Sequence, residues 1–181
     1  MRRAGLEDVG DVARIHVESW RAAYRGLIAD EALAERTVEV RVKQWTKTLG
    51  APPTDRHTLY VAERGGSTVG FAWAGPSDDH DVDPAVTVNI YALYLDPARR
   101  GEGIGAALLE HVVDDFASRG FTRATLYVLV GNDPARRFYE RAGWELDAGV
   151  TKPCLGDGYE APQVRYSFDL ASRSARAEHS A

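Results

Sequence analysis

The chain has 181 residues, of which 44% are hydrophobic and 27% charged, so it can form one domain with a buried core and is not wholly disordered. Its net charge of −5 argues against a duplex-binding protein, which needs a basic face. The single cysteine, Cys154, excludes a disulfide within the chain and a multi-cysteine zinc site. No apolar run reaches the ~20 residues of a membrane helix, and no signal-peptide pattern follows the N-terminal arginines. We therefore expect a cytoplasmic protein with no membrane or nucleic-acid partner.

The N-terminal third predicts two helices. Apolar residues recur at spacings of three and four over residues 8–24, which is the pattern of a helix with one buried face. Residues 37–49 show the same period. The prolines within residues 51–55 then predict a loop.

The pattern next changes to that of strands. Residues 57–64 and 67–75 are rich in strand-forming residues and meet at Gly65-Gly66, which predicts a hairpin. Residues 78–85 contain four aspartates and a proline, so we expect an exposed, solvated loop. Residues 85–97 are apolar on both faces, which predicts a strand at the centre of the sheet.

The remaining segments complete a mixed α/β domain. Residues 104–119 predict a helix that ends at Gly120. We expect further strands over residues 121–130, 144–150 and 163–170, and a short helix from Asn132 to Arg141. Residues 171–181 have no apolar residue larger than alanine, so we expect a single domain over residues 1–170 and a disordered tail over 171–181.

The segment from Leu93 to Leu109 carries the most informative pattern. A strand ends, arginines turn the chain, and the alternate glycines Gly101, Gly103 and Gly105 open a helix. Alternating glycines let a ligand approach the backbone closely. The first amides of a helix lack partners and carry the positive end of its dipole, so phosphate is their natural ligand.

This segment also fits two other interpretations. The simpler one is a glycine-rich turn without a ligand. Gly101-x-Gly103-x-x-Ala106 also matches a dinucleotide-binding expression, which would indicate an oxidoreductase. However, this match begins six positions after Leu95, the last residue of the apolar run, and residues 126–132 lack the acidic residue that such sites place after the next strand.

A register that begins at Arg100 resembles a known family. Arg100-x-x-Gly103-x-Gly105 matches the R/Q-x-x-G-x-G/A loop of the GNAT superfamily of acyl-coenzyme A N-acyltransferases. Residues 132–144 resemble that family's second signature, N-x-x-A-x-x-F-Y-E-x-x-G-F/W, and residues 14–28 look like the first helices of one subgroup. The resemblance spans roughly residues 4–170. It implies a GNAT-type fold, with a mostly antiparallel sheet of six to seven strands, splayed at the central strand and flanked by about four helices.

The resemblance also implies that acetyl-coenzyme A is the cosubstrate and that the reaction needs no metal. In the family the loop amides hold the pyrophosphate, and the central strand hydrogen-bonds the pantetheine arm. The residues carried over for coenzyme binding are Leu93, Leu95, Arg100, Gly101, Glu102, Gly103, Ile104, Gly105, Ala106, Asn132 and Tyr139. Tyr139 is also the expected catalytic acid beside the thioester sulfur, and its alternative is a core aromatic. The alternative for Asn132 is a helix N-cap.

The implied reaction is direct transfer of the acetyl group to a primary amine of a small molecule or peptide, through a tetrahedral intermediate. Many members carry a glutamate four residues before the position of Leu93, where this chain has Asn89, and asparagine cannot accept a proton. This departure motivates the alternative of a non-catalytic acyl-coenzyme A sensor. The candidates for the base are a water held by Asn89 and Tyr91, Glu18, His80, or His16, which also fits a packed core.

The acceptor site is the least specified part of the sequence. Four residues are expected to contact the amine: Trp20, Tyr24, Asn89 and Tyr91, of which the first two fit the core equally well. The aspartates within residues 78–83 are expected to face a cationic acceptor. A calcium loop is disfavoured there, because Pro84 and Ile90 replace its glycine and glutamate. The arginines at 99, 100, 136 and 137 are expected near the anionic coenzyme, and the resemblance makes a homodimer plausible.

Overall fold

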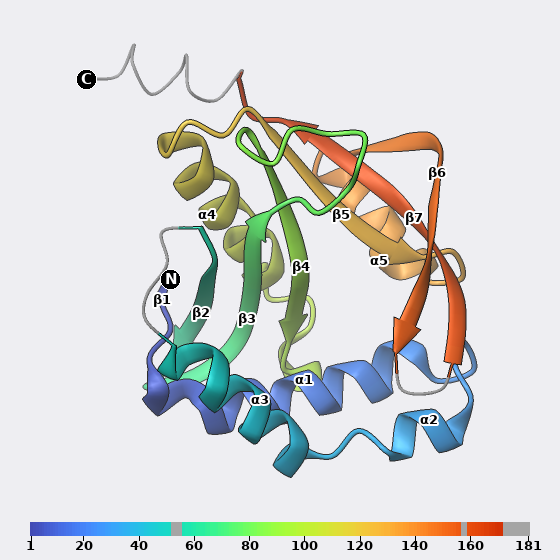
Figure 1. Cartoon of the computed structure of the whole chain (residues 1–181). Coiled ribbons are helices and arrows are strands. Elements are labelled where there is room, and N and C mark those ends of the chain that lie inside the picture. The colour runs from blue at the N-terminus through green and yellow to red at the C-terminus, as the bar shows by residue number, and fades with distance from the viewer. Residues whose placement is uncertain (52–55, 157–158, 172–181) are drawn as a thin grey trace.

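The computed structural model describes residues 1–51, 56–156 and 159–171 and places a seven-stranded sheet at the centre of the molecule (Figure 1). The strands are β1 (Arg2–Arg3), β2 (Thr58–Arg64), β3 (Ser67–Pro76), β4 (Thr87–Leu95), β5 (Arg123–Leu129), β6 (Glu145–Gly156) and β7 (Tyr159–Asp169). The helices are α1 (Val9–Tyr24), α2 (Asp30–Ala34), α3 (Val38–Gly50), α4 (Ile104–Ser118) and α5 (Asp133–Arg141), with 3₁₀ turns η1 (Leu6–Asp8) and η2 (Pro97–Arg99).

Helices cover both faces of the sheet, and each face has its own core. On one face, the apolar stripe of α4 packs with α5 on residues such as Val88 and Leu126. On the other face, α1 and α3 pack on β2 and β3, where Phe71 is fully buried. The predicted helices over 8–24, 37–49, 104–119 and 132–141 are therefore confirmed, because each carries one apolar face.

The strand order is β1-β2-β3-β4-β5-β7-β6, and only the β4–β5 pair is parallel. The predicted hairpin joins β2 to β3. Gly65 and Gly66 lie at φ 61° and 80°, a backbone conformation that suits glycine in a two-residue turn. The expected mixed α/β fold with a mostly antiparallel sheet is thus confirmed.

The sheet splits between β4 and β5. The two strands pair only from Thr87 to Ile90 and from Arg123 to Leu126. In contrast, β4 remains paired with β3 as far as Leu95. The expectation that β4 is central is correct, but its second half is not buried on both faces, because β5 diverges from it and Tyr91 is exposed.

Several features differ from the predicted elements. The short strand β1 and the five-residue helix α2 have too few residues for a periodic signal and were not predicted. Strand β6 continues beyond its predicted run, to Gly156, and β7 begins before its predicted run, at Tyr159. Most of the expected loop over 51–55, and residues 172–181 of the expected tail, lie outside the described residues. Among the described helices, none combines the length and apolar character of a membrane span.

Candidate active site

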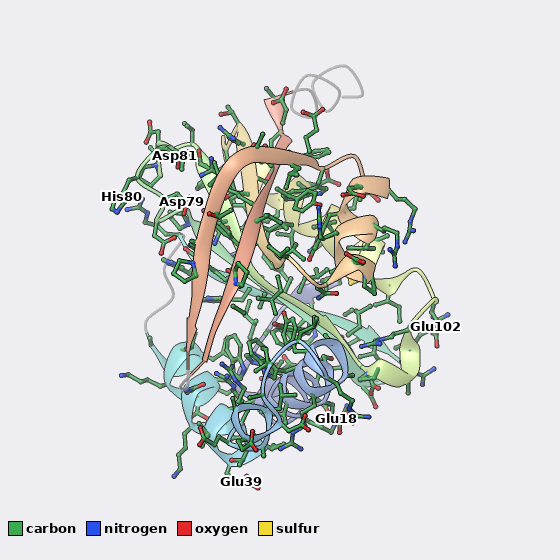
Figure 2. The ribbon with its side chains drawn as sticks, turned by 90° about the vertical axis from the view of Figure 1, so that its right-hand side faces the viewer. Glu18, Glu39, Asp79, His80, Asp81 and Glu102 are labelled. Atoms are coloured by element: carbon green, nitrogen blue, oxygen red, sulfur yellow. The ribbon has the colours of Figure 1, made fainter. Side chains whose placement is uncertain are left out.

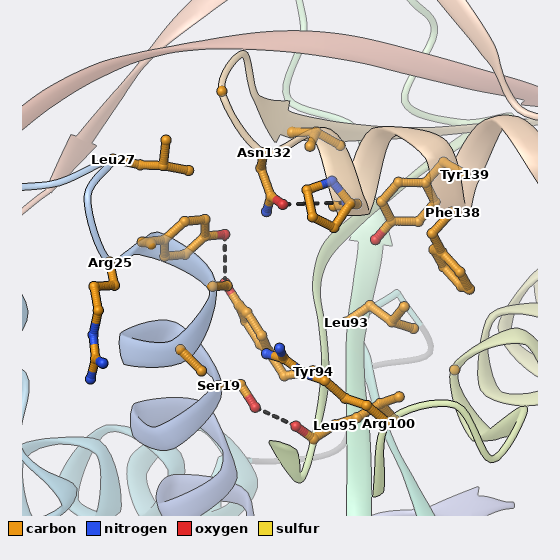
Figure 3. Close-up of a pocket in the computed structure, with 18 of the residues that line it drawn as sticks. Ser19, Arg25, Leu27, Leu93, Tyr94, Leu95, Arg100, Asn132, Phe138 and Tyr139 are labelled. Carbon is orange, nitrogen blue, oxygen red and sulfur yellow. Dashed lines mark hydrogen bonds between the residues drawn. The ribbon is translucent and has the colours of Figure 1, made fainter. Parts of the chain in front are cut away.

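A cavity of about 540 Å³ opens where β4 and β5 separate, between α1 and α5 (Figure 3). Its walls come from both strands, both helices and the segment after α1. The lining residues are Ser19, Ala22, Ala23, Tyr24, Arg25, Leu27, Leu93, Tyr94, Leu95, Arg100, Gly105, Tyr127, Val128, Gly131, Asn132, Pro134, Ala135, Phe138 and Tyr139. This set contains two arginines and no carboxylate, although the whole chain carries −5. The cavity therefore suits an elongated, partly apolar ligand with an anionic end.

The unpaired edge of β4 forms one wall. Leu93 and Leu95 both line the cavity, as expected, on the side from which β5 has diverged. One backbone group on this edge already has a partner, since the hydroxyl of Ser19 on α1 donates to the carbonyl oxygen of Leu95. Ser19 was not predicted, because this contact joins residues that are 76 positions apart.

The glycine loop lies at one end of the cavity. Gly103 adopts φ 76° as the residue that precedes α4, and no acidic side chain occupies the first turn of that helix. The first amides of a helix have no intrahelical partner, and no acidic residue in the first turn of α4 offsets its positive dipole end. A Cβ atom on Gly105 would lie 3.1 Å from Leu95 Cδ1, so glycine permits this close approach of helix and strand.

The predicted loop residues divide between three places. Arg100 and Gly105 line the main cavity, whereas Ile104 points into the core and is 8% exposed. Glu102, Gly103 and Ile104 border a second cavity of about 280 Å³. Gly101 and Ala106 are exposed. The Glu102 carboxylate accepts a hydrogen bond from Arg64 Nη1 at 2.7 Å and faces Arg99 at 3.5 Å.

The predicted arginine cluster is only partly formed at the cavity. Of the arginines at 99, 100, 136 and 137, Arg100 alone belongs to the lining described above. Arg136 donates to the hydroxyl of Tyr166 at 3.1 Å instead. Arg25, which the sequence pattern did not indicate, supplies the second positive charge of the lining.

Asn132 caps a helix and also lines the cavity. Its Oδ1 accepts from the amide of Ala135 at 3.3 Å and so caps α5 (Figure 3). Since the cap uses only the oxygen, the Nδ2 group can still donate to a ligand in the cavity that Asn132 lines.

Tyr139 lies on α5 with its hydroxyl directed toward the cavity (Figure 3). The residue is only 8% exposed, and its ring packs on Phe138 and Trp144. Burial, and secondly the neighbouring Tyr24, raise the pKa of Tyr139 above its ordinary value. The side chain therefore fits the core and the cavity wall at once, and its hydroxyl stays protonated at neutral pH.

The four expected acceptor residues are not brought together. Tyr24 lines the cavity, and its hydroxyl lies 3.3 Å from that of Tyr94. Trp20 lies behind it in the core, 7% exposed, with Arg36 Cζ 3.7 Å from its ring centroid. Asn89 is 4% exposed and accepts from Thr125 Oγ1 at 3.2 Å.

Tyr91, the fourth expected acceptor residue, lies outside the main cavity. It borders a neighbouring cavity of about 260 Å³, and its hydroxyl donates to the carbonyl of Pro76. Its ring stacks on His57. The expected pair of Asn89 and Tyr91 as holders of one water therefore has no support in their contacts.

The other candidate bases, Glu18, His16 and His80, do not line the main cavity. Glu18 is exposed and paired with Arg14 at 2.9 Å, and it lies at the opposite end of the molecule from His80 (Figure 2). His16 is stacked on Tyr94 and accepts from Trp45 Nε1 at 3.3 Å. Burial, with the charges of Arg41 and Arg36, lowers the pKa of His16 to about 3, so it is neutral and a weak base, and it lies half-buried beside the neighbouring cavity of about 260 Å³.

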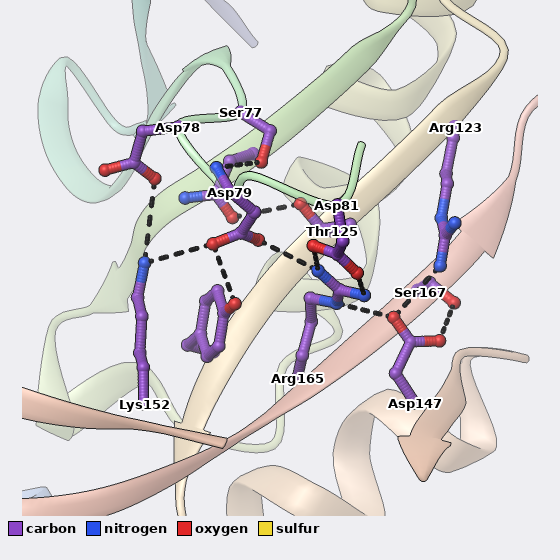
Figure 4. Close-up of polar contacts among 12 residues, drawn as sticks. Ser77, Asp78, Asp79, Asp81, Arg123, Thr125, Asp147, Lys152, Arg165 and Ser167 are labelled. Carbon is purple, nitrogen blue, oxygen red and sulfur yellow. Dashed lines mark hydrogen bonds and ion pairs between the residues drawn. The ribbon is translucent and has the colours of Figure 1, made fainter. Parts of the chain in front are cut away.

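The aspartate loop is exposed, as predicted, but two of its aspartates, Asp79 and Asp81, pair with Arg165 within the chain (Figure 4). Arg165 on β7 has a side chain only 3% exposed and bonds Asp79 at 3.2 Å, Asp81 at 2.7 and 2.6 Å, and Asp147 at 2.6 Å. Hydrogen bonds from Arg165 lower the pKa of Asp81 to about 2. The charge of Arg165 therefore balances two of the four aspartates, Asp79 and Asp81. These two are not free to attract a cationic acceptor.

Tyr127 on β5 connects this ionic network to the cavity. It lines the cavity, and its hydroxyl donates to Asp79 Oδ1 at 2.8 Å. Tyr127 was not among the predicted site residues. The only available signal was its place between Leu126 and Val128, which face the opposite core in the strand alternation.

The comparisons with known proteins agree with this architecture. The model of the acetyltransferase (GNAT) family matches residues 14–144. The N-acetyltransferase YuaI of Bacillus subtilis is 30% identical over 143 residues, which cover 77% of this chain and 76% of that protein.

Two solved structures show the same fold. A ribosomal-protein-alanine N-acetyltransferase of Brucella melitensis superposes with a TM-score of 0.69 at 23% identity, covering 93% of this chain and 98% of that one. The PaiA N-acetyltransferase of Thermoplasma acidophilum, solved in complex with coenzyme A, has a TM-score of 0.68 at 18% identity, covering 92% and 97%. The fold, the split sheet and the family match lead to one conclusion: the chain belongs to the GNAT family of acetyltransferases.

Proposed function

We propose that this GNAT acetyltransferase binds acetyl-coenzyme A in the cavity between β4 and β5 and transfers its acetyl group directly to a primary amine of a small molecule or peptide. One observation carries the proposal. The split of the sheet brings Arg100 and Gly105, beside the N-terminus of α4, into the lining of one cavity with Tyr139, and a helix N-terminus suits a pyrophosphate.

The coenzyme would lie along this cavity. The amides that open α4, with Arg100, would bind the pyrophosphate, and the edge of β4 at Leu93 would hydrogen-bond the pantetheine arm. Asn132 Nδ2 would hydrogen-bond the same arm. The relative from Thermoplasma acidophilum was solved with coenzyme A, which supports a coenzyme site in this fold.

Tyr139 would donate to the departing sulfur. A thiol has an ordinary pKa of about 8.5, so the thiolate leaves fairly well and needs modest help. The raised pKa of Tyr139 keeps the proton on its oxygen until the C–S bond breaks. Hydrogen bonding to the developing thiolate is therefore its main contribution.

The amine must lose a proton before it attacks. A lysine-like amine of pKa about 10.4 is only about 1 part in 2,500 neutral at pH 7, a cost of roughly 4.6 kcal/mol. An α-amine of pKa about 8 pays only about 1.4 kcal/mol. Because Asn89 is engaged with Thr125 and His16 is a weak base, the site favours an acceptor of lower pKa, such as a peptide N-terminus.

A thiol-release assay with acetyl-coenzyme A tests the proposal. The amine panel contains an alanine-headed hexapeptide, tyramine and spermidine. We expect turnover with at least one amine, highest for the peptide at pH 7, and a smaller difference at pH 9. Tight binding of acetyl-coenzyme A without turnover on any amine would instead indicate a coenzyme-binding sensor.

A further inference from the structure

The wall of the cavity that faces β4 contains a polar side chain to which the proposed mechanism gives no role. Tyr127 belongs to this wall, and Asp79 beyond it receives the Tyr127 hydroxyl proton in a 2.8 Å hydrogen bond. We infer that the Tyr127 oxygen is the hydrogen-bond acceptor that orients the attacking amine, and that Asp79 is the positioning residue that fixes this oxygen. The inference rests on the proposed amine acetylation.

The direction of the hydrogen bond between the two residues is determined by chemistry. The Asp79 carboxylate also faces two cationic donors, Arg165 Nη1 at 3.2 Å and Lys152 Nζ at 3.5 Å (Figure 4). An ionised carboxylate only accepts hydrogen bonds, so the Tyr127 hydroxyl must donate. With its proton committed, the phenol oxygen offers only lone pairs to any further partner. It selects a partner that carries an N–H group.

The surroundings hold this oxygen in place. Lys152 Nζ lies 4.1 Å from the centroid of the Tyr127 ring, a cation–π contact. Asp79 is 9% exposed, and the Arg165 side chain that holds it is only 3% exposed. Arg165 is itself fixed by Asp81 and Asp147. The Tyr127 oxygen is therefore preorganised before a ligand binds, which is the condition for effective electrostatic assistance.

The reaction makes such a group useful. The amine nitrogen must aim its lone pair at the acetyl carbonyl, which leaves its N–H bonds directed elsewhere. As the new C–N bond forms, the nitrogen gains positive charge, and its N–H bonds become stronger donors. A hydrogen bond from this nitrogen to the Tyr127 oxygen is then stronger in the transition state than in the ground state, and so it raises kcat.

Three charged side chains, Asp79, Lys152 and Arg165, lie around the Tyr127 phenol. Burial and Asp79 raise the pKa of Tyr127 above its ordinary value, while Arg165 lowers it and Lys152 contacts the ring. The neutral phenol therefore persists through the pH range in which an amine is acetylated. This agrees with a role as a neutral acceptor of a hydrogen bond.

The first test compares two matched tyrosine variants, Tyr127→Phe and Tyr60→Phe. Tyr60 also donates to an aspartate, Asp115, at 2.6 Å, and Asp115 is also held by an arginine, but Tyr60 lies in the core away from the cavity. The probe is the panel amine that the wild-type protein acetylates fastest. We expect Tyr127→Phe to lower kcat/KM for that amine about 10- to 100-fold. The KM for acetyl-coenzyme A should stay unchanged, and Tyr60→Phe should keep both constants.

The second test needs no acceptor. The eight tyrosines are labelled with ¹³Cζ, and the Tyr127 signal is identified by its loss in Tyr127→Phe. We expect Asp79→Asn to lower the pKa of Tyr127, since a negative neighbour is removed, whereas Asp115→Asn leaves it unchanged. An unchanged Tyr127 pKa in Asp79→Asn would overturn the coupling of the two residues.

The two tests also separate this inference from the proposed function. Amine acetylation that is equal in wild type and Tyr127→Phe contradicts the role of Tyr127 alone. Absence of acetylation in the wild-type protein contradicts the proposed function, and with it the catalytic part of the inference.

Discussion

Ile90 of β4 and Leu126 of β5 are the last partners in the parallel ladder between these strands. Beyond them β4 keeps its partner β3, and β5 keeps its partner β7. The unpaired edges of β4 and β5 therefore lie in the interior of the sheet. Their backbone N–H and C=O groups are available to a ligand, but they are less exposed to solvent than those of a strand at the outer edge. The cavity that carries the proposed activity is a direct consequence of this split.

The glycine before α4 can be tested against a matched glycine at the other end of the same helix. Gly103 and Gly120 have φ 76° and 88°, and a Cβ on either meets no atom within 4 Å. Valine therefore strains both backbones, but only at Gly103 does it screen the amides proposed to bind pyrophosphate. We expect Gly103→Val to weaken coenzyme A binding at least about 10-fold in calorimetry, and Gly120→Val to retain it. Equal affinities in the two variants would refute the loop assignment.

Removal of the Tyr139 hydroxyl tests the acid role. Tyr139→Phe keeps the ring that packs on Trp144, so the fold should be retained. We expect turnover to fall about 10-fold or more, toward the lower end of general-acid effects, because a thiolate is already a fair leaving group. The dissociation constant for coenzyme A, measured by calorimetry, should change much less. A variant with unchanged turnover would remove Tyr139 from this role.

His16 predicts a specific dependence of stability on pH. Its folded pKa of about 3 lies below the ordinary value of about 6.5, so the unfolded chain binds a proton that the folded chain does not. The contribution of His16 to stability is therefore present above pH 6.5 and declines as the pH falls toward 3, by up to about 1.4 kcal/mol per pH unit.

Urea unfolding of wild type and His16→Gln at pH 8, 6, 5 and 4 measures this effect. Glutamine retains an acceptor for the Trp45 indole N–H but does not titrate. We expect the stability advantage of the wild type to shrink as the pH falls. Parallel pH profiles for the two proteins would show that His16 is not buried in its neutral form.

The Arg165 network predicts a large contribution to stability. Arg165→Met leaves three carboxylates without their shared partner, of which Asp79 is 9% and Asp147 17% exposed. We expect a loss of about 3–5 kcal/mol in urea unfolding. Arg64→Met, which breaks the surface pair with Glu102, should cost less than about 1 kcal/mol. Similar losses in both variants would contradict the account of a buried network.

The parts that the sequence predicted correctly depend on local patterns. The hairpin follows from adjacent glycines, α4 from its apolar stripe, and the cap of α5 from Asn132. In each case the residues that determine the structure lie within a few positions of one another. Local period and turn chemistry were therefore sufficient for most of the fold.

The parts that were missed depend on contacts between distant segments. Tyr127 and Asp79 are 48 positions apart, and Arg165 and Asp81 are 84 apart, so neither pair leaves a periodic signal. The divergence of β5 from β4 is set by pairing across the whole sheet. For that reason the sequence wrongly predicted a fully buried central strand, and it missed the ion pairs that join the exposed aspartate loop to Arg165.

The most direct test of the central claim is mass spectrometry of the acceptor amine after incubation with acetyl-coenzyme A that carries ¹³C in its acetyl group. The account predicts a labelled acetyl amide on a panel amine, release of coenzyme A, and an enzyme of unchanged mass. An unmodified amine panel, with acetyl-coenzyme A still bound intact, would contradict it.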